Sequence, residues 1–178
     1  ADAPFGGVAA VSPDSRLVAF ANGDGSISVR DMFTSDPVST MQGHTLVGSL
    51  TFSPDGARLV SAGTGGMMVS DTTVRVWDVA TGTELGMFDL GELTPVLALD
   101  AAGTTIAVVT YNVESASQAI QLIDMASLTV SGSIAVPAGS IAGVAFSPDG
   151  SLIAVSNSLF DDAQGGWASA LRFYDRSS

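Results

Sequence analysis

The sequence of 178 residues is long enough for one domain with a substantial core, and its 46% of hydrophobic residues argues against disorder. Eighteen acidic side chains against six basic ones give a net charge of −12, which would repel the phosphates of nucleic acids. The absence of cysteine excludes disulfides and thiolate chemistry, and the single histidine, His44, is too little for a histidine metal cluster.

The first recurring element joins two short apolar stretches through a polar turn. In "FSPDGARLVS", residues 52–61, the proline fixes φ and the glycine accepts a positive φ, so we expect two antiparallel strands with a tight turn between them. The turn glycines Gly56, Gly103 and Gly150 follow one another at intervals of 47 residues, and Ser15 holds the equivalent place in the first copy. The four copies are residues 11–20, 52–61, 99–108 and 146–155.

The second recurring element is a strand that ends in aspartate. In "VRVWD", residues 74–78, valines alternate with Arg75, and a Thr-Gly pair just beyond marks a turn. Equivalent segments are "ISVRD" at 27–31, "IQLID" at 120–124 and "LRFYD" at 171–175. Two elements that recur four times in the same order indicate an internal repeat.

Each repeat has room for four short strands, a to d. Strands that are apolar on both faces must be covered on both, as happens when small sheets stack on one another. We therefore predict an all-β fold, a β-propeller of four blades with four antiparallel strands each, the last blade lacking strand d. The expected blades are approximately residues 5–42, 43–90, 91–135 and 136–178 of a single propeller segment.

The second repeat resembles the WD-repeat β-propeller family in residues 43–82. The resemblance rests on "GH" at 43–44, "FSPDG" at 52–56 and "DTTVRVWD" at 71–78. It implies a hydrogen-bonded structural tetrad that ties off the polar edge of a buried indole, and the matching positions here are His44, Ser61, Asp71 and Trp77.

The other repeats lack parts of this tetrad. The first keeps Asp24 but has Arg30 in place of the tryptophan, and the third and fourth have Ile123 and Tyr174 there. We therefore expect one tetrad, with His44 in a structural role. The alternatives for His44 are a surface loop position and a catalytic or metal-binding role.

The loops between strands b and c vary in length, whereas the a–b turns are nearly uniform. In a propeller the b–c and d–a loops share one face, so these expansions gather on one side of the fold. Their apolar and aromatic residues are of types enriched at binding hot spots, and we expect them to contact a partner; the alternative is local packing over the blade edges. The candidates are Met67, Met68, Tyr111, Leu159, Phe160 and Trp167.

No catalytic, cofactor-binding or metal-binding constellation can be read from the sequence. Asp161 and Asp162, followed by two glycines, could hold a calcium ion, but a solvated acidic loop is the commoner explanation of such a pair. We therefore predict no cofactor.

The resemblance implies a non-catalytic scaffold for protein–protein interaction or assembly. The alternatives are a propeller domain of an extracytoplasmic enzyme, of hydrolase or quinone-dependent type, and a structural component of a surface or extracellular assembly. Fold alone does not decide among these functions. The low fraction of charged residues and the absence of lysine favour an extracytoplasmic location over a cytoplasmic one.

The unfinished last blade predicts an outside contribution to the ring. We expect a protein partner or the remainder of the same polypeptide to add a strand next to residues 169–175 and to cover the exposed blade faces, with a homo-oligomer as the alternative. A membrane span is not expected: residues 125–148 carry no charge but contain two prolines and many polar residues.

Overall fold

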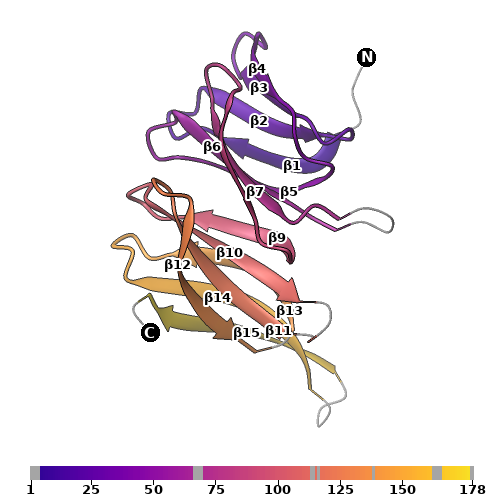
Figure 1. Ribbon diagram of the computed structural model, residues 1–178, viewed down its shortest axis with the longest axis vertical. Coiled ribbons are helices and arrows are strands. Elements are labelled where there is room, and N and C mark those ends of the chain that lie inside the picture. Colours follow the sequence, from indigo (N-terminus) through magenta and orange to yellow (C-terminus); the bar gives the residue numbers. More distant parts are fainter. Residues whose placement is uncertain are drawn as a thin grey trace. The chain divides into compact units, whose positions relative to one another are not determined.

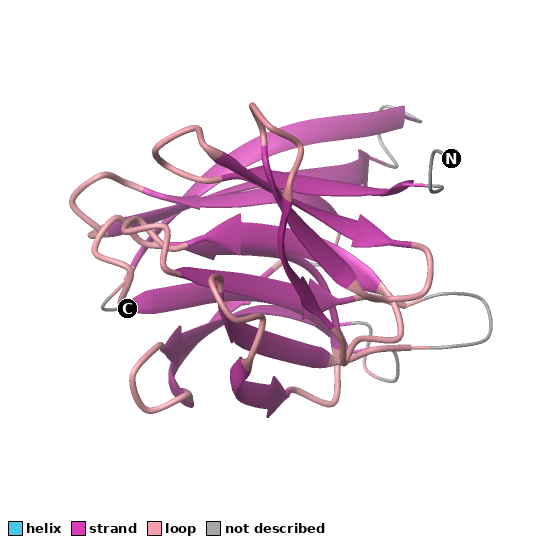
Figure 2. Ribbon diagram, turned by 90° about the horizontal axis from the view of Figure 1, so that it is seen from above, coloured by secondary structure: helices cyan, strands magenta, loops and turns pink. Residues whose placement is uncertain are grey.

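The computed structural model describes residues 5–65, 70–112, 115, 117–137, 139–161 and 166–176. Within these ranges the regular structure consists of strands, which are joined by loops and turns (Figures 1 and 2). None of the described residues lies in a helix long and apolar enough to cross a membrane. The chain divides into two compact units, Ala1–Pro95 and Val96–Ser178.

The first unit holds two four-stranded antiparallel sheets, and in each the strands follow one another in chain order. The first sheet consists of β1 (Phe5–Val11), β2 (Leu17–Asn22), β3 (Ile27–Asp31) and β4 (Pro37–Met41). The second consists of β5 (Val47–Phe52), β6 (Arg58–Gly63), β7 (Thr73–Asp78) and β8 (Glu84–Asp89).

The remaining strands form a four-stranded and a three-stranded antiparallel sheet. The third sheet consists of β9 (Leu93–Leu99), β10 (Thr105–Asn112), β11 (Ser117–Asp124) and β12 (Thr129–Val136). The fourth consists of β13 (Ser140–Phe146), β14 (Leu152–Asp161) and β15 (Gly166–Asp175). Among the described residues, the four sheets are those expected from the repeats, and the last of them has three strands.

The a–b turns form for the reasons that the repeated motif suggests. Gly56, Gly103 and Gly150 have φ angles of 72°, 69° and 71°, and Ser15 adopts the same left-handed conformation with φ of 59°. In the second turn, Asp55 accepts hydrogen bonds from the Ser53 hydroxyl at 2.5 Å and from the Ala57 N–H at 3.0 Å. The short polar side chains therefore satisfy the backbone where the ladder stops.

The aspartate that closes the third strand caps the following turn in the first three sheets. Asp78 accepts hydrogen bonds from the backbone N–H and the hydroxyl of Thr81, at 2.9 and 2.8 Å. Asp124 does the same with Ser127, both at 2.8 Å. The aspartate of the Trp-Asp pair thus belongs to turn geometry, while the tryptophan belongs to the core.

Sheet-on-sheet packing forms the core of each unit. In the first unit, alternating residues of the first sheet meet a tryptophan-centred face of the second, through Ala19, Ala21, Ile27, Val29 and Met41 on one side and Val47, Leu50, Phe52, Leu59, Trp77 and Val79 on the other. In the second unit, Ala107, Ile120, Leu122, Ile134 and Val136 pack with Ile153 and Val155. The alternation of the strands decides which side chains meet in each interface.

Candidate functional site

Four side chains of the first unit form a buried line of hydrogen bonds. Trp77 Nε1 donates to Ser61 Oγ at 2.7 Å, and Ser61 Oγ lies 2.7 Å from His44 Nε2. His44 Nδ1 in turn lies 2.9 Å from Asp71 Oδ2. The structure thus brings together all four residues that the sequence suggested for a tetrad, and each is less than a tenth exposed.

The strand register explains how distant residues reach this line. Leu59 on β6 lies opposite Trp77 on β7, so Ser61, two residues further along, is the diagonal neighbour of Trp77 on the same face. His44 lies in the segment between β4 and β5, and Asp71 lies just before β7. The two loop residues therefore extend a contact that the sheet itself creates.

The protonation states follow from burial and hydrogen bonding. Burial lowers the pKa of His44, and the attraction of Asp71 offsets this only in part. Burial would raise the pKa of Asp71, but hydrogen bonds from Thr73, the Thr45 N–H and His44 outweigh it and lower the pKa. A neutral imidazole beside a carboxylate is therefore the resting state.

A neutral His44 assigns every donor in the line. Its Nδ1–H donates to Asp71, its Nε2 accepts the Ser61 hydroxyl proton, and the Ser61 oxygen accepts the Trp77 N–H. No polar atom of this network is left without a partner, which is what a buried polar network needs to be stabilising.

This serine–histidine–aspartate sequence has the connectivity of a nucleophilic triad but cannot act as one. Ser61 is 0% exposed, and its oxygen is already occupied by the indole N–H of Trp77. A nucleophile must face a space where a substrate atom can sit about 3 Å away. The arrangement therefore holds two strands and two loops together and has no access to substrate.

The predicted partner-binding residues are only partly described. Tyr111 lies near the end of β10, half-buried, opposite Gln118 of β11. The backbones of Leu159 and Phe160 pair with Ala168 and Trp167 across β14 and β15, and the side chains of Leu159, Phe160 and Trp167 are outside the described part. Met67 and Met68 lie outside the described residues altogether. Contact with a partner at these residues stays a prediction.

The possible calcium site is likewise untested. Asp161 is the last residue of β14, with only its backbone described, and Asp162 lies outside the described residues. Within the described ranges, no three histidine, aspartate or glutamate side chains are grouped so that they could hold a metal ion.

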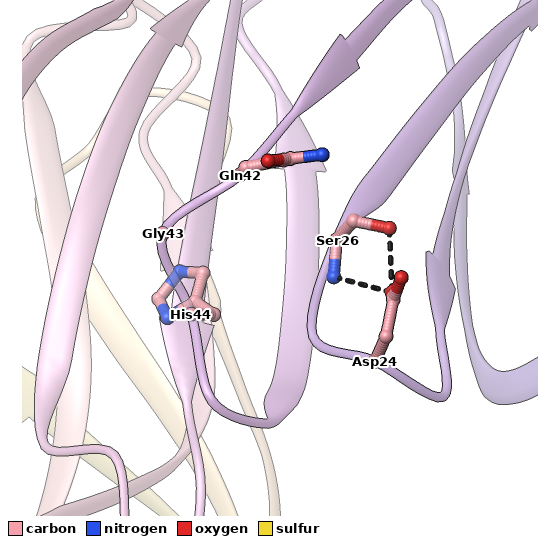
Figure 3. Close-up of a pocket in the computed structure, with 5 residues that line it drawn as sticks. All are labelled: Asp24, Ser26, Gln42, Gly43 and His44. Atoms are coloured by element: carbon pink, nitrogen blue, oxygen red, sulfur yellow. Dashed lines mark hydrogen bonds between the residues drawn. The ribbon is translucent and has the colours of Figure 1, made fainter.

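A polar notch of about 310 Å³ was not anticipated from the sequence. It is lined by Asp24 and Ser26 from the β2–β3 hairpin and by Gln42, Gly43 and His44 from the segment after β4 (Figure 3). The segment "NGDG", residues 22–25, forms the turn between β2 and β3. The available signal was Asp24, which keeps the tetrad's aspartate position in a repeat that lacks the tryptophan.

Comparisons with known proteins agree with this architecture. Residues 35–78 match the family of the WD domain, G-beta repeat. The protein groucho of Drosophila melanogaster is 42% identical over 81 residues, which cover 45% of this chain and 10% of groucho. The hydrazine synthase structure of Kuenenia stuttgartiensis superposes with a TM-score of 0.81 at 19% identity, over 95% of this chain and 50% of that one.

These similarities concern the repeat and the fold. The chain spans about a tenth of groucho and half of the hydrazine synthase chain, and at 19% identity the latter shows fold alone. Together with the four antiparallel sheets, they confirm the predicted β-propeller fold. The chain thus has a β-propeller fold, and residues 35–78, mostly in its second repeat, match the WD-repeat family.

Proposed function

We propose that this chain is a non-catalytic scaffold for protein interaction or assembly. The observation that carries the proposal is that its single histidine is enclosed in the buried network of Ser61, Asp71 and Trp77. The one imidazole that could act as an acid or base near neutral pH is thereby committed to the core. The match of residues 35–78 to the WD-repeat family supports the proposal, because propellers of that family generally bind proteins.

Affinity capture with matched surface variants tests this function. The full chain and a Phe160→Ala/Trp167→Ala variant serve as baits, and Phe33→Ala is the control because Phe33 is 82% exposed in the turn after β3. We expect a defined set of proteins with the wild type and with the control, and its loss with the double variant. Unchanged capture together with a lower melting temperature would assign the two aromatic residues to local packing instead.

Analysis of the purified chain for bound metal and quinone tests the non-catalytic assignment separately. A stoichiometric metal ion or quinone would favour the extracytoplasmic enzyme over the scaffold. The proposed extracytoplasmic location is tested by fractionation of the source cells.

We also propose that a further β-sheet covers the outer face of the last sheet. Leu171 and Phe173 on β15 are 61% and 64% exposed, whereas the equivalent Ile120 and Leu122 on β11 are 0% and 4% exposed because the next sheet covers them. Two large apolar side chains are thus exposed to water at positions that pack against the next sheet in the third repeat, which indicates an interface. The remainder of a longer polypeptide or a protein partner would supply the covering sheet.

A further inference from the structure

The notch between the β2–β3 hairpin and the segment after β4 has polar walls. Asp24 and Gln42 are exposed, Ser26 and His44 are buried, and Gly43 presents backbone only. In Figure 3, the hairpin with Asp24 and Ser26 forms one side and the segment with Gln42 and His44 forms the other. At about 310 Å³ the notch is at the small end of ligand sites and suits a single side chain.

Two glycines fix the walls of this notch. Gly25 has φ of 83°, and a Cβ there would lie 2.2 Å from the carbonyl oxygen of His44, so the hairpin is seated directly on the neighbouring segment. A Cβ on Gly43 would lie 2.6 Å from the guanidinium of Arg75. One wall of the notch therefore rests on backbone and the other on the Arg75 side chain, and the notch is already formed before any ligand arrives.

Hydrogen bonds fix the carboxylate of Asp24 as they fix that of Asp71, but at Asp24 they reach only one of the two oxygens. Asp71 Oδ1 accepts hydrogen bonds from the Thr73 N–H at 3.0 Å and hydroxyl at 2.6 Å, and Asp24 Oδ1 accepts the same two bonds from Ser26 at the same distances. Asp71 Oδ2 accepts two further N–H groups, from His44 and Thr45. No described residue donates to Asp24 Oδ2. Asp24 Oδ2 is thus an oriented carboxylate oxygen of the first repeat. The equivalent oxygen of the second repeat, Asp71 Oδ2, already accepts N–H donors.

The charge around the notch favours a cation. The hydrogen bonds from Ser26 lower the pKa of Asp24, so its carboxylate is ionised at neutral pH. The guanidinium of Arg75, which lies next to Gly43, forms an ion pair with Glu84 and donates a hydrogen bond to the Thr73 hydroxyl. The 178 residues have a net charge of −12 and contain no lysine, so an ammonium side chain in the notch must come from outside them.

We propose that this notch binds the ammonium group of a lysine side chain presented by a protein partner. Asp24 Oδ2 would accept a charge-assisted hydrogen bond, and the amide oxygen of Gln42 would accept a second one. Since Asp24 Oδ1 already has two donors, the two-oxygen contact that a guanidinium group prefers is not available, which favours lysine over arginine. The inference rests on the proposed interaction function and names the chemistry that one part of the partner must carry.

Backbone NMR of the full chain tests this site directly. The probe is Nα-acetyl-lysine N-methylamide at low ionic strength, with the norleucine and arginine counterparts for comparison. We expect the lysine compound to shift the amides of Gly25, Ser26 and Gly43 in a saturable way. Asp24→Asn should weaken binding about tenfold, because a charge-assisted bond becomes a neutral one.

The matched control is Asp14→Asn in the same unit. Asp14 accepts the Ser12 hydroxyl at 2.6 Å and the Arg16 N–H at 3.0 Å, so this variant removes the same charge from the same kind of turn but leaves the notch unchanged. It should bind the lysine compound with wild-type affinity. Gln42→Leu, which leaves the hairpin intact, should weaken binding by about threefold through loss of one neutral acceptor.

Three results would overturn the proposal. They are equal shifts with the norleucine compound, equal affinity of the wild type and Asp24→Asn, and tighter binding of the arginine compound than of the lysine compound. Capture of protein partners by the wild-type chain can persist through all of these, so failure of the lysine site is distinguishable from failure of the scaffold function.

Discussion

At the scale of single residues, one hydroxyl connects the two halves of the buried network. Ser61 accepts from the indole of Trp77 and donates to His44, and both of those partners are themselves buried. The Ser61 hydroxyl therefore pairs one buried donor, the Trp77 N–H, with one buried acceptor, His44 Nε2, and neither is exposed to water.

Ser61→Ala should destabilise the chain by about 2 to 4 kcal/mol, because it leaves the Trp77 N–H and His44 Nε2 without partners in the core. Ser169→Ala, at an exposed position of β15, should change stability by less than about 0.5 kcal/mol. Urea unfolding followed by tryptophan fluorescence measures both variants. Similar midpoints for the two would show that the network adds nothing to stability.

The pH dependence of stability should report on the same network. Burial holds the pKa of His44 below its ordinary value of 6.5. Below pH 6.5, therefore, His44 binds a proton in the unfolded chain at a pH where it is still neutral in the folded chain. Stability should therefore be greatest above pH 6.5 and fall as the pH is lowered from 6.5 toward the folded pKa.

The carboxylates act in a different range, which makes the histidine effect separable. Backbone hydrogen bonds from Thr34 lead the causes that lower the pKa of Asp31 to about 2, so its contribution is lost only below its ordinary value of 3.8. His44→Gln should be less stable than the wild type and should lose the pH dependence that sets in below pH 6.5. Unfolding midpoints that vary equally with pH in both proteins would contradict a neutral buried His44.

At the scale of elements, hairpin β2–β3 depends on the close seating of its turn. Gly25 and Gly91 both have positive φ, of 83° and 65°, but only Gly25 faces backbone within 4 Å. The pair separates the cost of the left-handed conformation from the cost of contact.

Gly91→Ala should lower the free energy of unfolding by about 1 kcal/mol, the cost of the conformation alone. Gly25→Ala should lower it at least twice as much, because its Cβ would lie 2.2 Å from the His44 carbonyl oxygen. Denaturant titration of the two variants measures the difference. Equal losses would mean that the hairpin can move away from the segment after β4, and that the walls of the notch are not fixed.

At the scale of the whole molecule, the question is what covers β15. Replacing Leu171 and Phe173 by serine removes exposed apolar area without removing core contacts, so the free energy of unfolding should stay within about 0.5 kcal/mol of the wild type. The same double variant should associate less, because the apolar face that a further sheet would cover is gone.

Sedimentation measures this association, with Phe33→Ser as the control because Phe33 is exposed in a turn and not on a sheet face. We expect self-association of the isolated wild-type chain and of the control, and a monomer for Leu171→Ser/Phe173→Ser. A monodisperse wild-type monomer with the same behaviour as the double variant would argue against a covering sheet.

The sequence by itself determined the repeat, the strand order and the turn chemistry. These features are local or periodic: proline, glycine and aspartate act on their own backbone, and alternation places side chains on one face or the other. The positions of the tetrad came from the family resemblance. Its residues lie up to 33 positions apart in the chain, and no local rule brings His44 to Ser61.

Only the tertiary structure decided which polar groups were already satisfied. Asp24 and Asp71 occupy equivalent positions and make the same two hydrogen bonds through Oδ1, yet Oδ2 of Asp71 accepts two N–H groups and Oδ2 of Asp24 accepts none from the described residues. The difference lies in the segments that pass beside each turn, which come from other parts of the repeat. A carboxylate's role depends on the donors within about 3 Å, and those donors are set by packing between sheets, which no stretch of sequence specifies alone.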